Sequence, residues 1–325
     1  MLASLSIDLD SLQHYHRIHG LAEPAEDGDP VYGKALERFG ELCDRLGVRG
    51  TVFCVGQNLC HAAAAAAVRG LSEAGHEIAN HSFSHDYALA RRPPPRIAAE
   101  LRGGAEAIAR ATGRWPLGFR APGYTLSADL LDVLVADGYR YDSSAFPALP
   151  YYLGKAAVVS LLAVSGRPSK AVLGSPRVLF APRRPYQPRR GKPYAPGAGT
   201  NALPILELPV ATGLFGFPLI GTFVGSFPHR ALRALCLGTA RLPLFDLELH
   251  GLDLLEACDA SPALAARQRD LAIPARRKIA RIEAFVRSLS EREWVTLAMA
   301  AERLRKGIGA TSEDSEAPAA PPGTG

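Results

Sequence analysis

The chain has 325 residues, of which 47% are hydrophobic and 21% charged, and its formal net charge is +5. This composition is typical of a globular protein and excludes a disordered or fibrous chain, while the charge is too small to indicate nucleic-acid binding by itself. The chain contains no run of about 18 apolar residues that would predict a transmembrane helix. The N-terminus lacks the basic region and the long apolar core of a secretory signal. The five cysteines are scattered, which predicts reduced thiols in a cytoplasmic protein.

Apolar runs alternate with helical patterns from the N-terminus onward. The first strand is predicted over residues 5–10, and the next helix has its apolar face at Leu36, Phe39 and Leu42 and ends at Gly47. About eight short strands with helices between them predict a parallel sheet or a (β/α) barrel. Further strands are predicted at 51–55, 77–80, 117–120, 139–143, 205–210, 245–249 and 294–297, and further helices at 62–74, 97–111, 127–138 and 279–289.

Two segments depart from this alternation. Residues 151–202 hold nine Lys or Arg and no Asp or Glu, so the whole positive balance of the chain lies there. They are also rich in Pro, Gly and Tyr, which predicts a loop or lid inserted into the fold. We therefore expect one catalytic domain over 1–308, with this insertion, and a disordered tail over 309–325.

Two short motifs carry carboxylates and imidazoles suited to a metal ion. Asp8 and Asp10, two apart at the end of the first predicted strand, share one face of it. His81 and His85 are four apart, and imidazoles so placed can bind one metal. Two histidines and one carboxylate leave a position open for water, as in catalytic zinc sites. Two solvated carboxylates are the alternative for the aspartate pair, and His76 is interpreted as a core or supporting histidine.

Later motifs follow other strands. Arg120 could orient a carboxylate through two of its nitrogens, and the turn after it could offer a backbone N–H to a substrate oxygen. His250 ends a late strand and is a general-acid candidate, with Asp253 placed to fix its tautomer. For each motif alone, an ordinary structural residue is the alternative. The residues expected to bind the substrate are Pro122, Gly123, Tyr124, Asp142, Glu207 and Asp253, whereas His14, His16 and His19 are expected to be exposed surface histidines.

In this order, the motifs resemble those of the polysaccharide deacetylases, carbohydrate esterase family 4 with the NodB-homology fold. That family has an Asp motif on its first strand, then His-Ser/Thr-x-x-His, then Arg-x-Pro, and a late strand that ends in His. The matching residues here are Asp8 and Asp10, His81-Ser82-Phe83-Ser84-His85, Arg120-Ala121-Pro122 and His250. The similarity is clear over residues 3–145 and looser over 203–300.

The resemblance implies an α/β fold, a distorted (β/α) barrel of seven to eight strands, that hydrolyses an N-acyl group, acetyl above all, of an amino sugar. It implies that Asp8 is the general base, that Arg120 holds Asp8 ionised, and that His250 protonates the leaving amine. One divalent metal ion, zinc before others, is expected to polarise the acyl carbonyl and to bind the attacking water. Its implied ligands are Asp10, His81 and His85.

Three departures from the family pattern predict a divergent member. Leu9 separates two aspartates that are adjacent in the family, Gly123 precedes the Tyr of Arg-x-Pro-Tyr, and Glu248 stands in the late Leu-x-His motif. With no export signal, we expect a cytoplasmic protein, in contact with the inner face of the membrane, rather than one that acts on chitin or peptidoglycan.

The expected substrate is a small phosphate-bearing or lipid-linked amino sugar, which suits the basic segment 151–202. Lipid-linked aminoarabinose deformylases are a precedent in this fold. The apolar stretches 156–164 and 214–227 are expected to lie in the core rather than on a bilayer. No nucleic-acid partner is expected, because the basic segment lacks regularly interleaved aromatic residues.

Two alternatives to a sugar N-deacylase stay open. The first is another amidase of the same superfamily, similar to the allantoinases or the deformylases. The second is a catalytically silent protein that binds carbohydrate or lipid. The intact set of acidic, histidine and arginine residues argues against the silent protein, since the loss of any of them would be its simplest sign.

Overall fold

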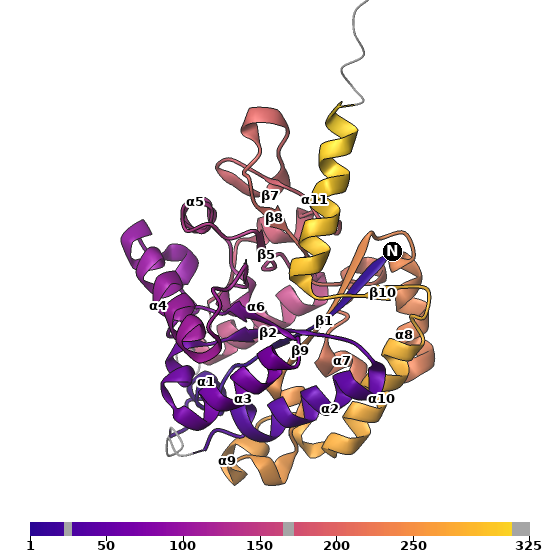
Figure 1. The fold of residues 1–325 in the computed structure, drawn as a ribbon. Coiled ribbons are helices and arrows are strands. Elements are labelled where there is room, and N and C mark those ends of the chain that lie inside the picture. Colours follow the sequence, from indigo (N-terminus) through magenta and orange to yellow (C-terminus); the bar gives the residue numbers. More distant parts are fainter. Residues whose placement is uncertain (23–27, 165–171, 314–325) are drawn as a thin grey trace, which may run out of the picture.

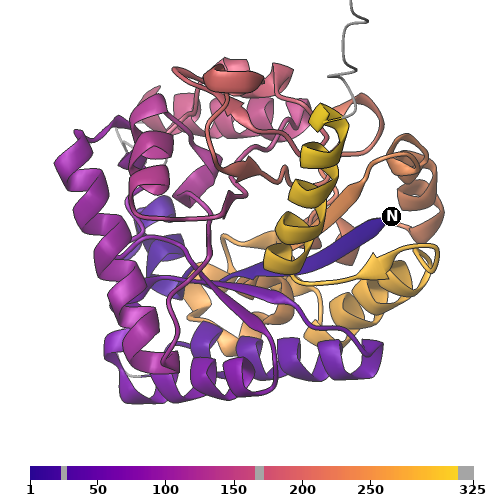
Figure 2. The same cartoon turned by 45° about the horizontal axis from the view of Figure 1, so that its top comes forward.

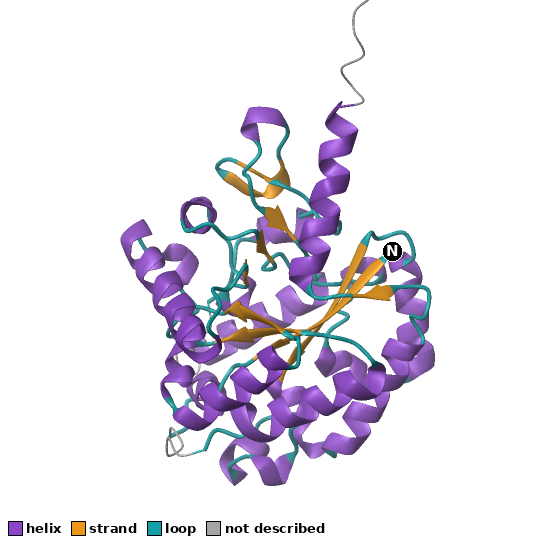
Figure 3. Ribbon diagram, viewed as in Figure 1, coloured by secondary structure: helices purple, strands orange, loops and turns teal. Residues whose placement is uncertain are grey.

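A curled parallel sheet forms the centre of the molecule, with helices around it (Figure 3). The computed structural model describes residues 1–22, 28–164 and 172–313. The strands of this sheet are β1 (Leu2–Asp8), β2 (Thr51–Cys54), β3 (Glu77–Asn80), β4 (Gly118–Phe119), β5 (Tyr141–Asp142), β8 (Leu206–Glu207), β9 (Leu244–His250) and β10 (Glu293–Trp294).

The strand order is β10-β1-β2-β3-β4-β5-β8, and β9 pairs with β1 along its whole length. All of these pairings are parallel. After β8 the chain curls back to β9, where Val210 and Asp246 form a single parallel bridge. The fold is therefore the predicted distorted (β/α) barrel, and the carboxyl ends of its strands meet at one end of the molecule.

The helices that follow the strands cover the outside of the sheet (Figures 1 and 2). They are α1 (Leu12–His19), α2 (Leu36–Leu46), α3 (Ala62–Glu73), α4 (Pro94–Thr112), α5 (Ala128–Ala136), α6 (Leu149–Val164), α7 (Gly221–Ser226), α8 (His229–Cys236), α9 (Pro262–Ala265), α10 (Ala275–Arg287) and α11 (Leu297–Glu313). A short antiparallel hairpin of β6 (Pro188–Arg189) and β7 (Lys192–Pro196) lies outside the barrel sheet.

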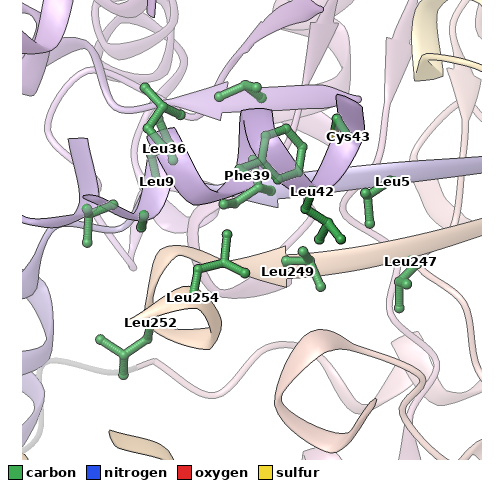
Figure 4. Packing of buried hydrophobic residues seen from close by; sticks show 14 of the residues in the cluster. Leu5, Leu9, Leu36, Phe39, Leu42, Cys43, Leu247, Leu249, Leu252 and Leu254 are labelled. Atoms are coloured by element: carbon green, nitrogen blue, oxygen red, sulfur yellow. The ribbon is translucent and has the colours of Figure 1, made fainter. Parts of the chain in front are cut away.

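The core under α2 shows why the predicted periodicities produce these elements. Leu36, Phe39 and Leu42 recur at helical spacing on one face of α2 and are fully buried. They share a cluster with Leu5 of β1 and Leu247 of β9 (Figure 4). Burying each such side chain stabilises the fold by about 1.5–3 kcal/mol. The helix predicted from these residues is therefore confirmed, and it braces the two longest strands.

The first strand begins earlier than predicted, at Leu2 rather than Leu5, and ends at Asp8. Its polar residues Ser4 and Ser6 conceal the strand pattern, although both are completely buried. Ser4 Oγ donates to the carbonyl of Val295 at 2.8 Å, and Ser6 Oγ donates to Asp246 Oδ1 at 2.9 Å. These partners satisfy the hydroxyls inside the barrel, so polar residues extend the strand at little cost.

The basic segment 151–202 is not the simple loop or lid that its composition predicts. Most of α6 and the hairpin belong to it, and its Val178, Ala181 and Tyr194 are buried in a hydrophobic cluster with helices α4 and α5. Tyr194 Oη accepts a hydrogen bond from the backbone N–H of Leu126 at 3.1 Å. The segment is folded because its scattered apolar side chains complete this core. Residues 165–171 lie outside the described residues.

Two further expectations need correction. The stretch 156–164 is not simply core, because Val158 and Val164 of α6 are 52% and 88% exposed; a helix that is apolar on every side cannot bury all its faces on one barrel. The stretch 214–227 is core only in part, because Leu219 and Val224 are completely buried whereas Phe215 and Phe227 are 92% and 37% exposed. The predicted tail begins too early, since α11 continues to Glu313 as backbone hydrogen bonds propagate the helix, and residues 314–325 lie outside the described residues.

Within the described part of the chain, no helix is both long enough and apolar enough to span a bilayer.

Candidate active site

Side chains that are far apart in the sequence meet at the carboxyl end of the barrel. Asp8 ends β1 and Asp10 follows it, His81 follows β3, Arg120 follows β4, and His250 ends β9. Parallel strands present their carboxyl ends on the same side, so these residues converge although Asp8 and His250 are 242 positions apart. The structure thereby brings together the predicted general base, general acid and metal ligands.

Asp10, His81 and His85 form a cluster that could hold a metal ion. His81 Nε2 and His85 Nε2 lie 3.2 and 2.9 Å from Asp10 Oδ1. His81 Nδ1 donates to the carbonyl of Arg120 at 2.7 Å, which turns Nε2 toward the cluster. A metal-binding histidine is commonly oriented by such a hydrogen bond from its second nitrogen.

Several polar atoms of this cluster lack hydrogen-bond partners. Within the ranges that the structure describes, Asp10 Oδ1 and both ring nitrogens of His85 are buried and form no hydrogen bond, because His85 Nε2 and Asp10 Oδ1 lie close together without hydrogen-bond geometry. Both side chains are less than a tenth exposed, so water does not satisfy these atoms freely. Buried polar atoms without partners are costly. Two imidazoles and a carboxylate that converge in this state fit a divalent metal ion, and zinc or a similar ion accepts this donor set.

The backbone around the site is strained. Among non-glycine residues of the described ranges, four have a positive φ, and Ser82, His85 and Tyr124 at the site are three of them, at 66°, 56° and 59°. A left-handed conformation costs such residues about 1–3 kcal/mol each and is frequent at functional sites. The strained conformations therefore occur at the candidate metal ligand His85 and at Tyr124, which contacts His250.

Neighbouring charges shift the pKa values of Asp10 and His81 in opposite directions. Burial alone would raise the pKa of Asp10, but His85 and His81 bring it well below the usual range of an aspartate. Burial alone would lower the pKa of His81, but Asp8 and Asp10 more than offset this and raise it. These shifts favour the ionised form of Asp10 and the protonated form of His81, and a metal ion bound to His81 would compete with that proton.

Arg120 is the centre of a second, fully satisfied cluster. Its Nη1 donates to Asp8 Oδ1 at 2.7 Å, and its Nη2 donates to Asp246 Oδ2 at 2.6 Å. Nε donates to the carbonyl of Ser143 at 2.9 Å, and the Phe53 ring lies 4.1 Å from the guanidinium carbon. The side chain is completely buried. Arg120 thus orients one oxygen of Asp8 and leaves Oδ2 to face the metal cluster.

The charges of the two clusters do not balance without a cation. Four buried carboxylates gather here, whereas Arg120 is the fixed positive charge and His250 a second when it is protonated. When His81 is neutral, as a metal ligand must be, two negative charges are in excess, which corresponds to one divalent ion. The carboxylates are Asp8, Asp10, Asp246 and Glu248.

His250 is held and charged by Glu248 of the same strand. Glu248 Oε1 lies 2.9 Å from His250 Nδ1, while His250 Nε2 lies 4.0 Å from Asp10 Oδ2 and 3.4 Å from Tyr124 Oη. Burial would lower the pKa of His250, but Glu248 raises it well above the usual value of a histidine. The imidazolium can therefore present a proton at Nε2 to a leaving group.

The sequence position of Asp253 predicted that it fixes the tautomer of His250. This prediction is wrong, because Glu248 rather than Asp253 contacts His250 Nδ1. Asp253 Oδ2 accepts the backbone N–H of His250 at 2.8 Å, and Oδ1 accepts from Thr222 Oγ1 at 2.9 Å. With both oxygens used and 2% of its surface exposed, Asp253 shapes the turn after β9 rather than contacting a substrate.

Asp142 and Glu207 were also expected to contact the substrate, and both are completely buried instead. Asp142 accepts from the hydroxyl and backbone N–H of Ser144, and Ser144 Oγ accepts the backbone N–H of Ala121 at 2.8 Å. Glu207 Oε1 accepts the backbone N–H of Ala145 at 2.8 Å. The two carboxyl groups therefore support the segment that holds Arg120. A sequence does not show this role, because a carboxylate at a strand end can equally well face a ligand.

The predicted substrate turn lies beside an aromatic wall. Pro122 is buried, and the N–H of Tyr124 donates to the carbonyl of Ala121 at 3.0 Å, so that group is not free for a substrate oxygen. The ring of Tyr124 lies 5.0 Å from Phe146 and 5.7 Å from Tyr151. These rings border the side of the site where His250 is 20% exposed.

Three further histidines have structural or supporting places in the fold. His76 is buried and its Nδ1 accepts the backbone N–H of Gly50 at 3.1 Å, in line with its predicted core role. His14 and His16 are not surface residues as predicted, because they are 5% and 2% exposed. The ring of His14 packs against His85 with 4.1 Å between centroids. His14 and His16 border a cavity of about 860 Å³. The helix α1, which the sequence analysis missed, places them there.

Asp246 was missed by the sequence analysis, and Glu248 was seen there only as a departure from a motif. The strand pattern Asp246-Leu247-Glu248-Leu249-His250 does contain a signal, because residues two apart share one face. A polar face on a strand ordinarily points to solvent, whereas here it points into the barrel.

Comparisons with known proteins find a family match for part of the chain. Residues 26–141 match the family model described as polysaccharide deacetylase, a stretch that contains His81, His85 and Arg120. The chain therefore contains a domain of the polysaccharide deacetylase family. The predicted resemblance is confirmed for the domain, while Asp8, Asp10 and His250 lie outside the matched stretch. No curated protein matches the chain.

Solved structures share the fold at low sequence identity. A Mycobacterium smegmatis protein assigned to the polysaccharide deacetylases is 16% identical with a TM-score of 0.59, and the match covers 94% of this chain and 91% of that one. The Puue allantoinase is 15% identical with a TM-score of 0.55, over 93% of this chain and 89% of that one. An acetyl xylan esterase from Clostridium thermocellum, solved with a cobalt ion, is 16% identical with a TM-score of 0.46, over 92% and 90%.

Proposed function

We propose that this protein is a metal-dependent hydrolase that removes an N-acyl group, acetyl before others, from an amino sugar. The observation that carries the proposal is the set of unpartnered buried atoms of Asp10 and His85 beside His81. Asp8 and His250 lie on the two sides of this set. A divalent metal held there, zinc above all, would polarise an acyl carbonyl and lower the pKa of a water molecule.

The chain's own residues supply the proton transfers. Asp8 Oδ2, which lies 3.9 Å from His81 Nε2, accepts a proton from the attacking water, while Arg120 holds the carboxylate in place through Oδ1. His250 Nε2 donates a proton to the nitrogen as the C–N bond breaks, and Glu248 keeps His250 protonated beforehand. The products are a carboxylic acid and a free amine.

The basic segment 151–202 supports a phosphate-bearing or lipid-linked amino sugar as the substrate, since it has no acidic residue to neutralise it. Such a substrate would be met in the cytoplasm or at the inner face of a membrane. Nucleic acid is not part of the proposal.

A substrate panel tests the proposal. Protein loaded with zinc is incubated with N-acetylated and N-formylated amino sugars, with their phosphates, and with allantoin, and the released acid or ureide is measured. We expect acid release from at least one amino sugar, and its loss in the D8N variant. Turnover of allantoin alone would favour the amidase alternative, whose fold this chain shares, and no turnover by metal-loaded protein would contradict a hydrolase.

A further inference from the structure

Lys155 lies at the border of the site, on the helix that the basic segment contributes. It follows Tyr151 by four residues on α6, so the two side chains share one face of the helix. The Tyr151 ring packs against Tyr124 and Phe146, with centroid distances of 5.7 and 5.0 Å. This contact directs the Lys155 face of α6 toward the turn after β4.

The ammonium group of Lys155 reaches the middle of that turn. Nζ donates to the carbonyl of Gly123 at 3.1 Å. The next residue, Tyr124, contacts His250, and Gly123 also lies against Tyr87, whose ring packs edge-on to His85 at 4.7 Å. Two residues therefore link Lys155 to the proton donor, and two link it to a candidate metal ligand.

Lys155 has no carboxylate partner. It takes part in no ion pair within the part of the chain that the structure describes, and residues 151–202 contain no acid. Burial lowers the pKa of Lys155 to about 8, which leaves it mainly protonated at neutral pH. An ammonium has three N–H donors and the carbonyl of Gly123 uses one, so two remain for another group. A half-buried cation without a counter-ion is suited to an anion that arrives with a ligand.

We propose that Lys155 binds a phosphoryl group of the substrate and makes the site selective for phosphorylated amino sugars. This proposal rests on the proposed function and names the substrate class of the same site. Lysine binds phosphate as a point charge, and two free N–H donors of Lys155 suit the oxygens of a phosphoryl group. A soluble sugar phosphate and a lipid-linked sugar phosphate both carry this group, and the experiments below distinguish them.

Kinetics with paired substrates test the proposal. The kcat/KM for N-acetylglucosamine is compared with that for its 1- and 6-phosphates in wild type, K155M and the matched control K192A, which removes an exposed cation of the same segment. We expect wild type to favour a phosphate by about tenfold or more, the value of one charge-assisted hydrogen bond. K155M should lose most of this preference and K192A should keep it. An unchanged preference in K155M would overturn the proposal and leave the hydrolase function standing.

Binding of inorganic phosphate gives a readout that does not need turnover. Calorimetric titration of the metal-loaded proteins should show binding about tenfold weaker in K155M than in wild type and in K192A. Equal binding in wild type and K155M contradicts the role of Lys155 even if no substrate is turned over. If phosphate binds more weakly to K155M and no substrate is turned over, the result supports phosphate binding by Lys155 and counts against the proposed hydrolase function.

The source of the phosphate is resolved by a further pair of substrates. A short-chain polyprenyl-phosphate-linked N-acetyl sugar in detergent micelles is compared with the free sugar phosphate. A higher kcat/KM for the lipid-linked sugar, again reduced in K155M, assigns the phosphate to a lipid carrier. A higher kcat/KM for the free sugar phosphate, with the same dependence on Lys155, assigns it to a soluble substrate. Failure of K155M to lower either value overturns the proposal.

Discussion

Two buried polar clusters adjoin at the carboxyl end of the barrel, and they differ in how their polar atoms are satisfied. Around Arg120 all three guanidinium nitrogens donate to carboxylates, hydroxyls or a carbonyl. Around Asp10, an oxygen and both nitrogens of His85 have no such partner within the described ranges. The difference indicates that the Arg120 cluster is complete as a structural support. The Asp10 cluster is instead arranged for a cation that the protein chain does not supply.

Removing the charge of the finished cluster should have the largest effect. R120M would leave Asp8 and Asp246 in a buried site without their cation, which should lower the free energy of unfolding by about 3–5 kcal/mol. Urea denaturation measures this change. The matched control is R102M, which breaks an exposed pair with Asp137 and should cost no more than about 1 kcal/mol. Similar losses in the two variants would show that the Arg120 cluster is not a buried scaffold.

Asp8 belongs to both clusters, since one of its oxygens binds Arg120 and the other faces His81. D8N keeps the shape of the side chain but removes the basic oxygen, so kcat should fall by about 10²–10⁴-fold while the metal content is retained. Steady-state kinetics and elemental analysis of the same sample check this. A kcat close to that of wild type would exclude Asp8 as the base.

Metal should stabilise the unsatisfied cluster specifically. At a free zinc concentration of 100 times its Kd, the free energy of unfolding of wild type should rise by about 2.7 kcal/mol, because the ion binds only the folded chain. H85A should show no such gain, and the control H229A, at an exposed position, should behave as wild type. Denaturation with and without zinc measures both, and equal stabilisation of H85A would place the ion elsewhere.

The smallest effect should be a shift in a pH profile. Glu248 raises the pKa of His250, so wild type keeps the proton donor charged to a higher pH than an ordinary histidine would. E248Q removes that charge, and the basic limb of kcat/KM should move to lower pH by about 1–3 units. The control E291Q changes an exposed carboxylate and should leave the limb in place. If the basic limb does not move in E248Q, Glu248 does not control the protonation of His250.

The order of strands and helices was predictable because local patterns carry it. The apolar face of α2 and the cap that Ser127 provides for α5 both act within a few residues of sequence, and both are present. The barrel then follows from alternating strands and helices. The extent of β1 was not predictable, since the burial of Ser4 and Ser6 depends on partners more than 200 residues away.

The site residues were predictable from their motifs, but not because they share faces, since residues 81–85 form no helix and Asp10 lies beyond the end of β1. His81 and His85 meet Asp10 because each follows a parallel strand. The functions of Asp142, Glu207 and Asp253 were not predictable, because nothing in the sequence distinguishes a carboxylate that holds a backbone N–H from one that faces a ligand. Polar residues inside a barrel resemble surface residues until the partner strands are known.

The central claim is that Asp10, His81 and His85 hold one divalent metal ion. Elemental analysis of wild type, H81A and the control H229A tests it most directly, after supplementation with zinc and removal of unbound ions. The account predicts about one ion per chain in wild type and H229A, and its loss in H81A. Wild type without metal, or H81A with as much metal as wild type, would contradict the claim.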